Sequence, residues 1–163
     1  MTTPLFRTKN DLPEPTRAKI VELLAANLAS AIDLYLQTKQ AHWNVKGPNF
    51  TALHELFDDV GEIVEDAVDD IAERIVQLGG TARGTLQSVG KATSLRAYPL
   101  DISSGSDHVE ALSSALAAFG AGVRTASATA DEIGDADTAD LFTQISRTID
   151  KQLWLVEAHA PSR

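Results

Sequence analysis

The sequence predicts an all-α protein, a four-helix bundle with one long crossover loop. Apolar residues recur at spacings of three and four in four separate segments, and stretches rich in Gly, Pro or Ser divide those segments. A chain of 163 residues with 44% hydrophobic content is long enough to bury one core of ordinary size. We find no internal repeat and no second domain, so residues 1–163 are expected to form a single domain.

The first helix is expected from about Glu14 to Trp43. Pro13 and Pro15 mark its start, because proline is well tolerated in the first turn of a helix. Residues 1–13 then form a short N-terminal tail. The side chains expected to face the core are those of Ile20, Leu23, Leu24, Leu28, Ala31 and Leu34.

The second helix is expected from Asn49 to about Leu78. Gly47 and Pro48 separate it from the first helix, and the pair Gly79-Gly80 ends it. Its apolar residues follow a 4-3-4 spacing, which is typical of the buried seam of a helical bundle. The residues of this seam are Leu53, Phe57, Val60, Val64, Ile71, Ile75 and Leu78.

Residues 79–106 are expected to form a crossover loop with a short helix near Leu86 to Val89. A connection of ~26 residues can stretch to over 80 Å, whereas a 28-residue helix spans only ~42 Å, so the loop can run back along the bundle. Two further helices follow. The third carries Val109, Leu112, Leu116, Phe119 and Val123, and the fourth carries Leu141, Ile145, Ile149 and Val156.

Four side chains with metal-binding chemistry form one stripe on the second helix. His54 and Asp58 are separated by four residues, and so are Asp69 and Glu73. At 100° per residue, all four fall within roughly 100° of one another on the helix surface. The two pairs are centred roughly 22 Å apart along the axis, so one metal ion cannot use both. Each pair is therefore half a site, and an antiparallel second copy of the helix is the simplest completion.

The stripe points away from the core of its own chain. The apolar seam of the second helix lies roughly 140° from the stripe by the same arithmetic. Acidic residues on an exposed helix face can be merely solvated. Two aligned pairs, one of which contains histidine, favour metal binding instead.

His42 is a further candidate ligand at the end of the first helix. A tight hairpin would place it near His54 in the second turn of the next helix. A histidine beside a tryptophan is often a packed, hydrogen-bonded residue, and that alternative stays open for His42. The nearby His54 and Asp58 favour the ligand role.

Six segments resemble the Dps family, the DNA-binding proteins from starved cells, in order and spacing over nearly the whole chain. They are KQAHWNVKGPNF, ALHELFD, DDIAERIVQLGG, AYPLDI, DTADLF and DKQLW. The resemblance implies a ferritin-like subunit, a hollow homododecamer built from two-fold dimers, and ferroxidase centres at the two-fold interfaces. It implies that one chain supplies His42, His54 and Asp58 to each centre, and that its neighbour supplies Asp69 and Glu73.

The resemblance also implies a function. Such a protein oxidises Fe(II), preferentially with hydrogen peroxide, stores the ferric mineral inside the cage and so protects DNA from oxidative damage. Iron is the expected metal, with no organic cofactor. The chain has no cysteine, which leaves carboxylate and imidazole as ligands and suits iron. Trp43 near the site either donates electrons to the iron centre or packs at the interface.

The net charge of −9 is compatible with metal uptake. By resemblance, Asp140 together with Asp131 lines a three-fold pore through which iron enters. Asp137 is either a third pore residue or the cap of the fourth helix, where a carboxylate meets the helix dipole favourably.

DNA binding does not follow from the family name. The tail offers Arg7 and Lys9 against Asp11 and Glu14, and the C-terminal end adds only Arg163. So few cations predict weak duplex binding at physiological salt. Nucleoid compaction through twelve tails and a helical interaction module with vestigial ligands remain the alternatives. No secretory h-region and no run of ~18 apolar residues occur, so we expect a cytoplasmic protein, with the nucleoid as a possible location and no membrane partner.

Overall fold

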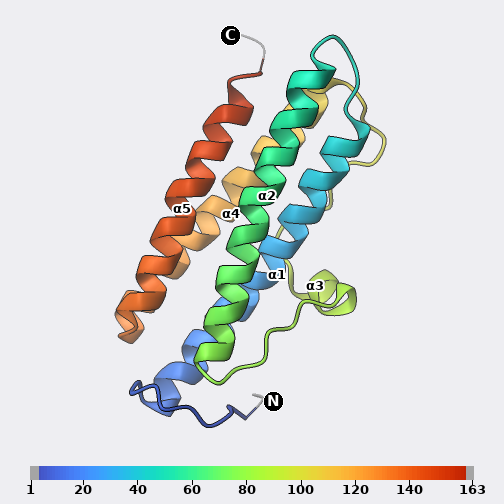
Figure 1. Cartoon of the computed structure of the whole chain (residues 1–163). Helices are drawn as coiled ribbons and strands as arrows, with labels where there is room; N and C mark the ends of the chain where they lie inside the picture. The colour runs from blue at the N-terminus through green and yellow to red at the C-terminus, as the bar shows by residue number, and fades with distance from the viewer. Residues whose placement is uncertain (1–3, 161–163) are drawn as a thin grey trace.

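The computed structural model describes residues 4–160, and their secondary structure is helical throughout, without a named strand. The five helices are α1 (Glu14–Asn44), α2 (Phe50–Gln77), α3 (Leu86–Ala92), α4 (Gly105–Ile133) and α5 (Ala136–Glu157) (Figure 1). The all-α prediction is confirmed. The expected ends of the two helices that carry the proposed ligands were correct to within a residue, whereas the short helix continues three residues beyond the expected Val89.

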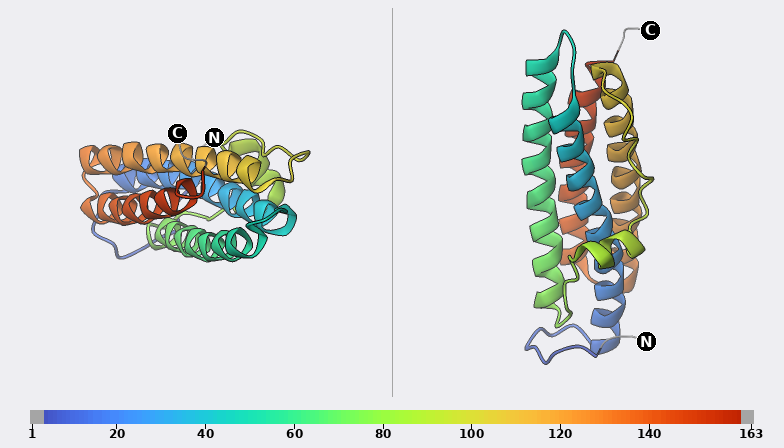
Figure 2. Two further views of the ribbon diagram at one scale, coloured as in Figure 1. Left: turned by 90° about the horizontal axis from the view of Figure 1, so that it is seen from above. Right: turned by 90° about the vertical axis from the view of Figure 1, so that its right-hand side faces the viewer.

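The four long helices form two antiparallel hairpins. α1 packs along α2 and α4 packs along α5, and these two pairs have the most extensive contacts in the chain. The crossover segment returns along the bundle from the end of α2 to the start of α4, with α3 lying across the side of α1 (Figure 2). This path makes α1 and α4 neighbours, which closes the bundle.

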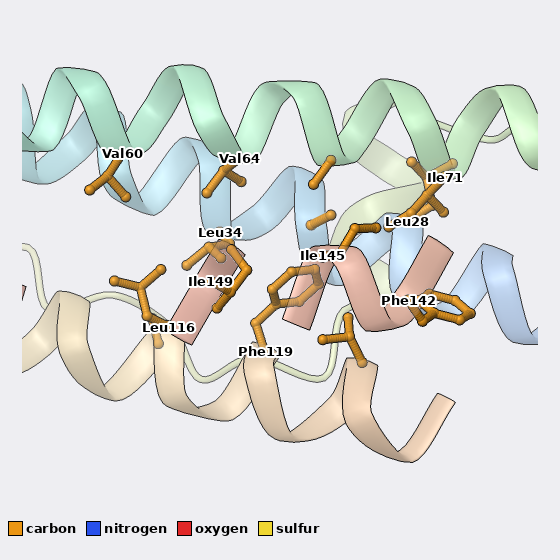
Figure 3. Close-up of a cluster of buried hydrophobic side chains, with 14 of the residues drawn as sticks. Leu28, Leu34, Val60, Val64, Ile71, Leu116, Phe119, Phe142, Ile145 and Ile149 are labelled. Atoms are coloured by element: carbon orange, nitrogen blue, oxygen red, sulfur yellow. The ribbon is translucent and has the colours of Figure 1, made fainter. Parts of the chain in front are cut away.

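Side chains from all four long helices meet in one core (Figure 3). The seam predicted for α2 is fully buried from Leu53 to Leu78. The buried face of α5 is rotated slightly from the predicted one. Phe142 is completely buried, while the predicted core residue Leu141 is only partly buried at the edge of the core. On α1, Leu23 is likewise partly buried.

The corner between α4 and α5 is held by Asp135, which is the N-cap of α5. Its carboxylate accepts hydrogen bonds from the backbone N–H of Thr138 at 3.1 Å and from the Thr138 hydroxyl at 2.6 Å. Arg74 of α2 binds both carboxylate oxygens, at 2.9 and 3.0 Å. Burial alone would raise the pKa of Asp135, but the hydrogen bonds from Thr138 and Arg74 outweigh it and lower that pKa. Of the two roles considered for Asp137, that of the helix cap is therefore wrong.

The described part of the N-terminal tail lies against the C-terminal end of α2. The backbone N–H of Phe6 donates to the Gly79 carbonyl at 2.7 Å, and the buried Arg17 donates to the carbonyls of Leu78 at 2.9 Å and Leu12 at 3.1 Å. Gly79 has φ +85°, and a Cβ there would lie 2.4 Å from the Phe6 carbonyl oxygen, so only glycine fits. Residues 1–3 of the predicted tail lie outside the described residues.

Among residues 4–160, α1 is the one helix that is long and apolar enough to cross a membrane by length and composition. The sequence has no unbroken apolar run of that length. The inward face of α1 packs against α2 and α4. A core helix of a bundle passes the same test, so this feature is weak evidence for a membrane span.

Candidate metal centre

The turn between α1 and α2 brings the two candidate histidines together. His42 lies in the last turn of α1, and His54 lies near the start of α2. Gly47, with φ +117°, allows the chain to reverse. The backbone N–H of Lys46 donates to the Ser103 carbonyl at 2.9 Å, so this turn is also attached to the end of the crossover segment.

His42 and His54 hold each other through the backbone. Nδ1 of His42 lies 2.7 Å from the carbonyl oxygen of His54, and Nδ1 of His54 lies 2.8 Å from the carbonyl oxygen of His42. The two rings stack with centroids 3.8 Å apart and planes at 19°, and Phe50 stacks on His54 at 5.0 Å. A carbonyl can only accept, so both Nδ1 atoms carry the proton. In the neutral rings both Nε2 lone pairs are then free to bind a metal ion.

Asp58 lies beside this histidine pair. Its Oδ1 is 3.8 Å from His42 Nε2 and 2.5 Å from Lys39 Nζ. The hydrogen bond from Lys39 lowers the pKa of Asp58, which keeps the carboxylate ionised, and it raises the pKa of Lys39 in return. Lys39 was not among the site residues predicted from the sequence. Its position three residues before His42, on the same face of α1, was the available signal.

Asp69 and Glu73 lie farther along α2, as the spacing predicts. Both carboxylates are exposed, and neither has a hydrogen bond or ion pair to the rest of residues 4–160. Within these residues, no three His, Cys, Asp or Glu side chains are grouped so that they could hold a metal ion. The single chain therefore presents two separate sets of candidate ligands, as expected for two half sites.

The three candidate pore residues lie at one corner of the bundle. Asp131 is in the last turn of α4, while Asp137 and Asp140 are in the first two turns of α5, and all three are exposed. The buried Asp135 fixes the start of α5 and so the positions of its neighbours. At the opposite end of the bundle, Trp43 is 65% exposed beside His42.

The class of the protein follows from its similarity to known proteins. Residues 21–161 match the family model described as a ferritin-like domain. This agrees with the four-helix bundle and its long crossover. The chain is similar to the DNA protection during starvation protein (Dps) of Agrobacterium fabrum, with 49% identity over 157 residues, 96% of this chain and 97% of that protein. It is also similar to the DNA protection during starvation protein 1 of Deinococcus radiodurans, with 31% identity over 147 residues, 90% of this chain and 71% of that protein.

The chain belongs to the Dps family, as its sequence motifs predict. Solved structures agree with this assignment. Dps of Mycobacterium smegmatis in its tetragonal form has a TM-score of 0.91 and 29% identity, with 96% of each chain covered. Dps of Microbacterium arborescens in the high iron form has a TM-score of 0.84 and 34% identity, covering 91% of this chain and 96% of that chain.

Proposed function

We propose that this protein oxidises Fe(II) with hydrogen peroxide at centres shared between two chains and stores the ferric product inside a dodecameric cage. The observation that carries the proposal is the reciprocal His42–His54 pair, which leaves two Nε2 atoms free next to the ionised Asp58. The similar Dps structure from Microbacterium arborescens is of a high iron form.

The donor set suits ferrous iron as the substrate. Imidazole nitrogens bind Fe(II), and carboxylates stabilise the Fe(III) that forms. Three ligands from one chain and two from another leave coordination positions open for peroxide. Two ferrous ions supply the two electrons that reduce one peroxide to water, so no hydroxyl radical is released. By removing ferrous iron and peroxide together, the reaction protects DNA.

The surface around the candidate ligands supports pairing with a second copy. Phe50, which stacks on His54, is 44% exposed, and Val76, on the α2 face that carries Asp69 and Glu73, is 59% exposed. Leu36 of the neighbouring helix α1 is 43% exposed as well. An antiparallel α2 from a second copy would cover these side chains and bring its own Asp69 and Glu73 to the histidines. Trp43 would then pack at this interface or serve as an electron donor.

Lys39 places a cation of the same chain beside the candidate ligand Asp58. Its ammonium group neutralises Asp58 before iron arrives, and it has to release that carboxylate when Asp58 binds iron. We propose that iron enters through a three-fold pore lined by Asp140, with Asp131 and Asp137 adding negative charge at the same corner. The Arg74–Asp135 ion pair holds these acids in place.

Iron storage is favoured over DNA coating as the main function. The described tail is fixed to the end of α2 through Phe6 and Gly79, and its cations, Arg7 and Lys9, are balanced by Asp11 and Glu14. Arg163 lies outside the described residues. We propose a cytoplasmic protein that protects DNA through iron chemistry, with weak nucleoid association at most.

Mixed cages test the division of the centre between chains. One variant carries His54→Ala and Asp58→Ala, and the other carries Asp69→Ala and Glu73→Ala. Each alone should form inactive cages, because every centre loses ligands. In a mixed dimer one centre combines the two damaged halves and the other combines the two intact halves. Random co-assembly should therefore restore about a quarter of wild-type ferroxidase activity.

The control is particle size, which should be about 209 kDa for twelve chains of 17.4 kDa in all three preparations. Wild-type cages should oxidise two Fe(II) per peroxide and keep the iron soluble. Mixed cages without activity above either parent would show that the centre lies within one chain. Iron that precipitates at the rate seen in buffer alone would reject the ferroxidase function and favour a plain interaction module.

A further inference from the structure

A hydrogen-bonded pair, the partly buried Tyr98 and the buried His108, lies outside the candidate metal centre. Tyr98 belongs to the crossover segment, and His108 belongs to the first turns of α4. The phenol oxygen of Tyr98 is 2.7 Å from Nδ1 of His108, and the two rings are inclined by only 17°. His108 is 1% exposed. A histidine this deeply buried next to a phenol is not needed for any step proposed above.

The protonation state of the pair follows from its surroundings. Burial raises the pKa of Tyr98, so the phenol is neutral. Burial lowers the pKa of His108, against smaller opposing effects of Asp107 and the Asn44 carbonyl, so the imidazole is neutral as well. The Tyr98 hydroxyl then donates to the free lone pair of Nδ1. Nε2 forms no hydrogen bond of good geometry within the described residues, and the nearby Asn44 carbonyl is the polar group it faces.

The pair is connected to the candidate metal centre by a short path. Asn44, whose carbonyl lies near the imidazole of His108, follows Trp43 and lies two residues after His42. A second connection is the hydrogen bond between Lys46 and Ser103, which attaches the turn after α1 to the start of α4. Backbone bonds and close polar contacts therefore link the Tyr98–His108 pair to the histidines that would bind iron.

We propose that Tyr98 is an internal one-electron donor that is oxidised to a neutral tyrosyl radical, with His108 as the acceptor of its phenolic proton. This inference rests on the proposed ferroxidase function. It concerns centres that hold a single Fe(II) when peroxide arrives. One electron then comes from Fe(II) and the second from Tyr98, and the O–O bond breaks to give two water molecules. Two protons come from solvent, while the phenolic proton moves to His108 Nδ1 and leaves an imidazolium ion.

The hydrogen bond is what makes this donor suitable. Removal of an electron from a phenol makes it a strong acid, and a charged phenol radical would be costly at this partly buried position, packed against the buried His108. A neutral imidazole at 2.7 Å can take the proton in the same step, and its new charge would be stabilised by Asp107 and the Asn44 carbonyl. A centre with one iron would otherwise release a hydroxyl radical. Tyr98 supplies the missing electron and prevents that release.

The chain offers a matched control. Tyr35 is the only other tyrosine in the sequence, and it lies half-buried on α1. Its hydroxyl forms no hydrogen bond with another described residue, so it has no base to accept a proton. The experiment loads cages anaerobically with one Fe(II) per centre, adds peroxide, freezes the sample rapidly and records the electron paramagnetic resonance spectrum.

A tyrosyl radical is expected in the wild type and in Tyr35→Phe, and it should be lost in Tyr98→Phe. His108→Gln, which keeps a polar group but provides no base, should lower the radical yield at least about tenfold. If His108→Gln fails to assemble, slower radical formation by wild-type cages in D₂O tests the same proton transfer. Hydroxyl radical captured by a spin trap should increase in Tyr98→Phe relative to Tyr35→Phe.

A signal that survives Tyr98→Phe, or that disappears in Tyr35→Phe or Trp43→Phe instead, would overturn the assignment. An unchanged rate in D₂O would overturn the role of His108. The same cages are assayed with two Fe(II) per peroxide. If the cages oxidise two Fe(II) per peroxide normally but form no Tyr98 radical at one Fe(II) per centre, this inference alone is rejected. If they fail to oxidise Fe(II) at two Fe(II) per peroxide, the proposed function is rejected and this inference with it.

Discussion

Lys39 Nζ lies 2.5 Å from Oδ1 of Asp58, so a carboxylate that is proposed to bind iron is already paired with a cation of its own chain. Iron and the lysine ammonium must therefore compete for Asp58. The competition is limited in strength, because the Asp58 side chain is 46% exposed and exposed ion pairs contribute little. Lys39 is best understood as a residue that balances the charge of Asp58 within the chain.

The first prediction follows from this competition. Lys39→Met keeps the length of the side chain but removes its charge, so Fe(II) should bind more tightly, by less than about tenfold. Anaerobic titration of Fe(II) into wild-type and variant cages measures the change. Lys19→Met removes a charge from the exposed face of α1 far from the centre and should leave the affinity unchanged. Weaker binding by Lys39→Met would mean that the lysine helps to hold the ligands rather than competing with iron.

The second prediction concerns the ion pair between Arg74 and Asp135. Asp135→Ala removes the cap of α5 and leaves the arginine without its partner in a largely buried position, which should cost about 3 kcal/mol of stability. Urea unfolding at neutral pH measures this loss. The double variant Arg74→Met/Asp135→Ala should be more stable than Asp135→Ala alone, because no charge is then left unpaired.

The same pair also sets a pH dependence. The pKa of Asp135 is lowered from 3.8 in the folded chain, so its stabilising contribution is complete above that value and is lost as the pH falls below it toward the folded pKa. The difference between wild type and Asp135→Ala should therefore shrink below about pH 4. Asp137→Ala, an exposed change two residues away, should stay within about 0.5 kcal/mol of wild type. Equal effects of Asp135→Ala and Asp137→Ala would contradict the assignment of the cap.

Local signals explain why the ends of α1 and α2 could be predicted from sequence. Pro13 and Pro15 limit where α1 can begin, and Gly79 ends α2 through a backbone conformation that other residues rarely adopt. The cap of α5 was missed because Asp135 and Asp137 are both suitable capping residues. The choice depends on Gly134, whose φ of +97° ends α4 one residue before Asp135.

The candidate centre could be predicted in part. Helical spacing alone places Asp69 and Glu73 on the face of His54, and the hairpin argument brings His42 close to it. The reciprocal bonds between each Nδ1 and the opposite carbonyl could not be foreseen, since they depend on how the two helix ends meet in space. Lys39 could have been found from its spacing to His42.

The third prediction tests the proposed pore. Asp140→Asn removes a negative charge from the corner between α4 and α5, so Fe(II) uptake should slow several-fold at low ionic strength and less at about 0.15 M salt, where screening acts over ~8 Å. Stopped-flow mixing of Fe(II) and peroxide with the cages measures the rate. Glu110→Gln removes the same charge from an exposed position near the other end of α4 and should have little effect. Equal slowing by both variants would show that overall charge, rather than a pore at Asp140, controls uptake.

The last prediction concerns DNA. Phosphate binding grows with the number of cations that contact the duplex, and the described tail offers Arg7 and Lys9 while Phe6 is fixed to Gly79. Wild-type cages should therefore fail to shift plasmid DNA at about 150 mM salt, and any shift at low salt should disappear in the Arg7→Ala/Lys9→Ala variant. The gain-of-function control is Asp11→Lys/Glu14→Lys, which exchanges two exposed acids of the same region for cations. Twelve such tails should retain DNA at the higher salt, because many weak contacts add along one duplex. Retention by the wild type at about 150 mM salt would instead show that the cage coats DNA directly, and iron chemistry would then be only part of how it protects DNA.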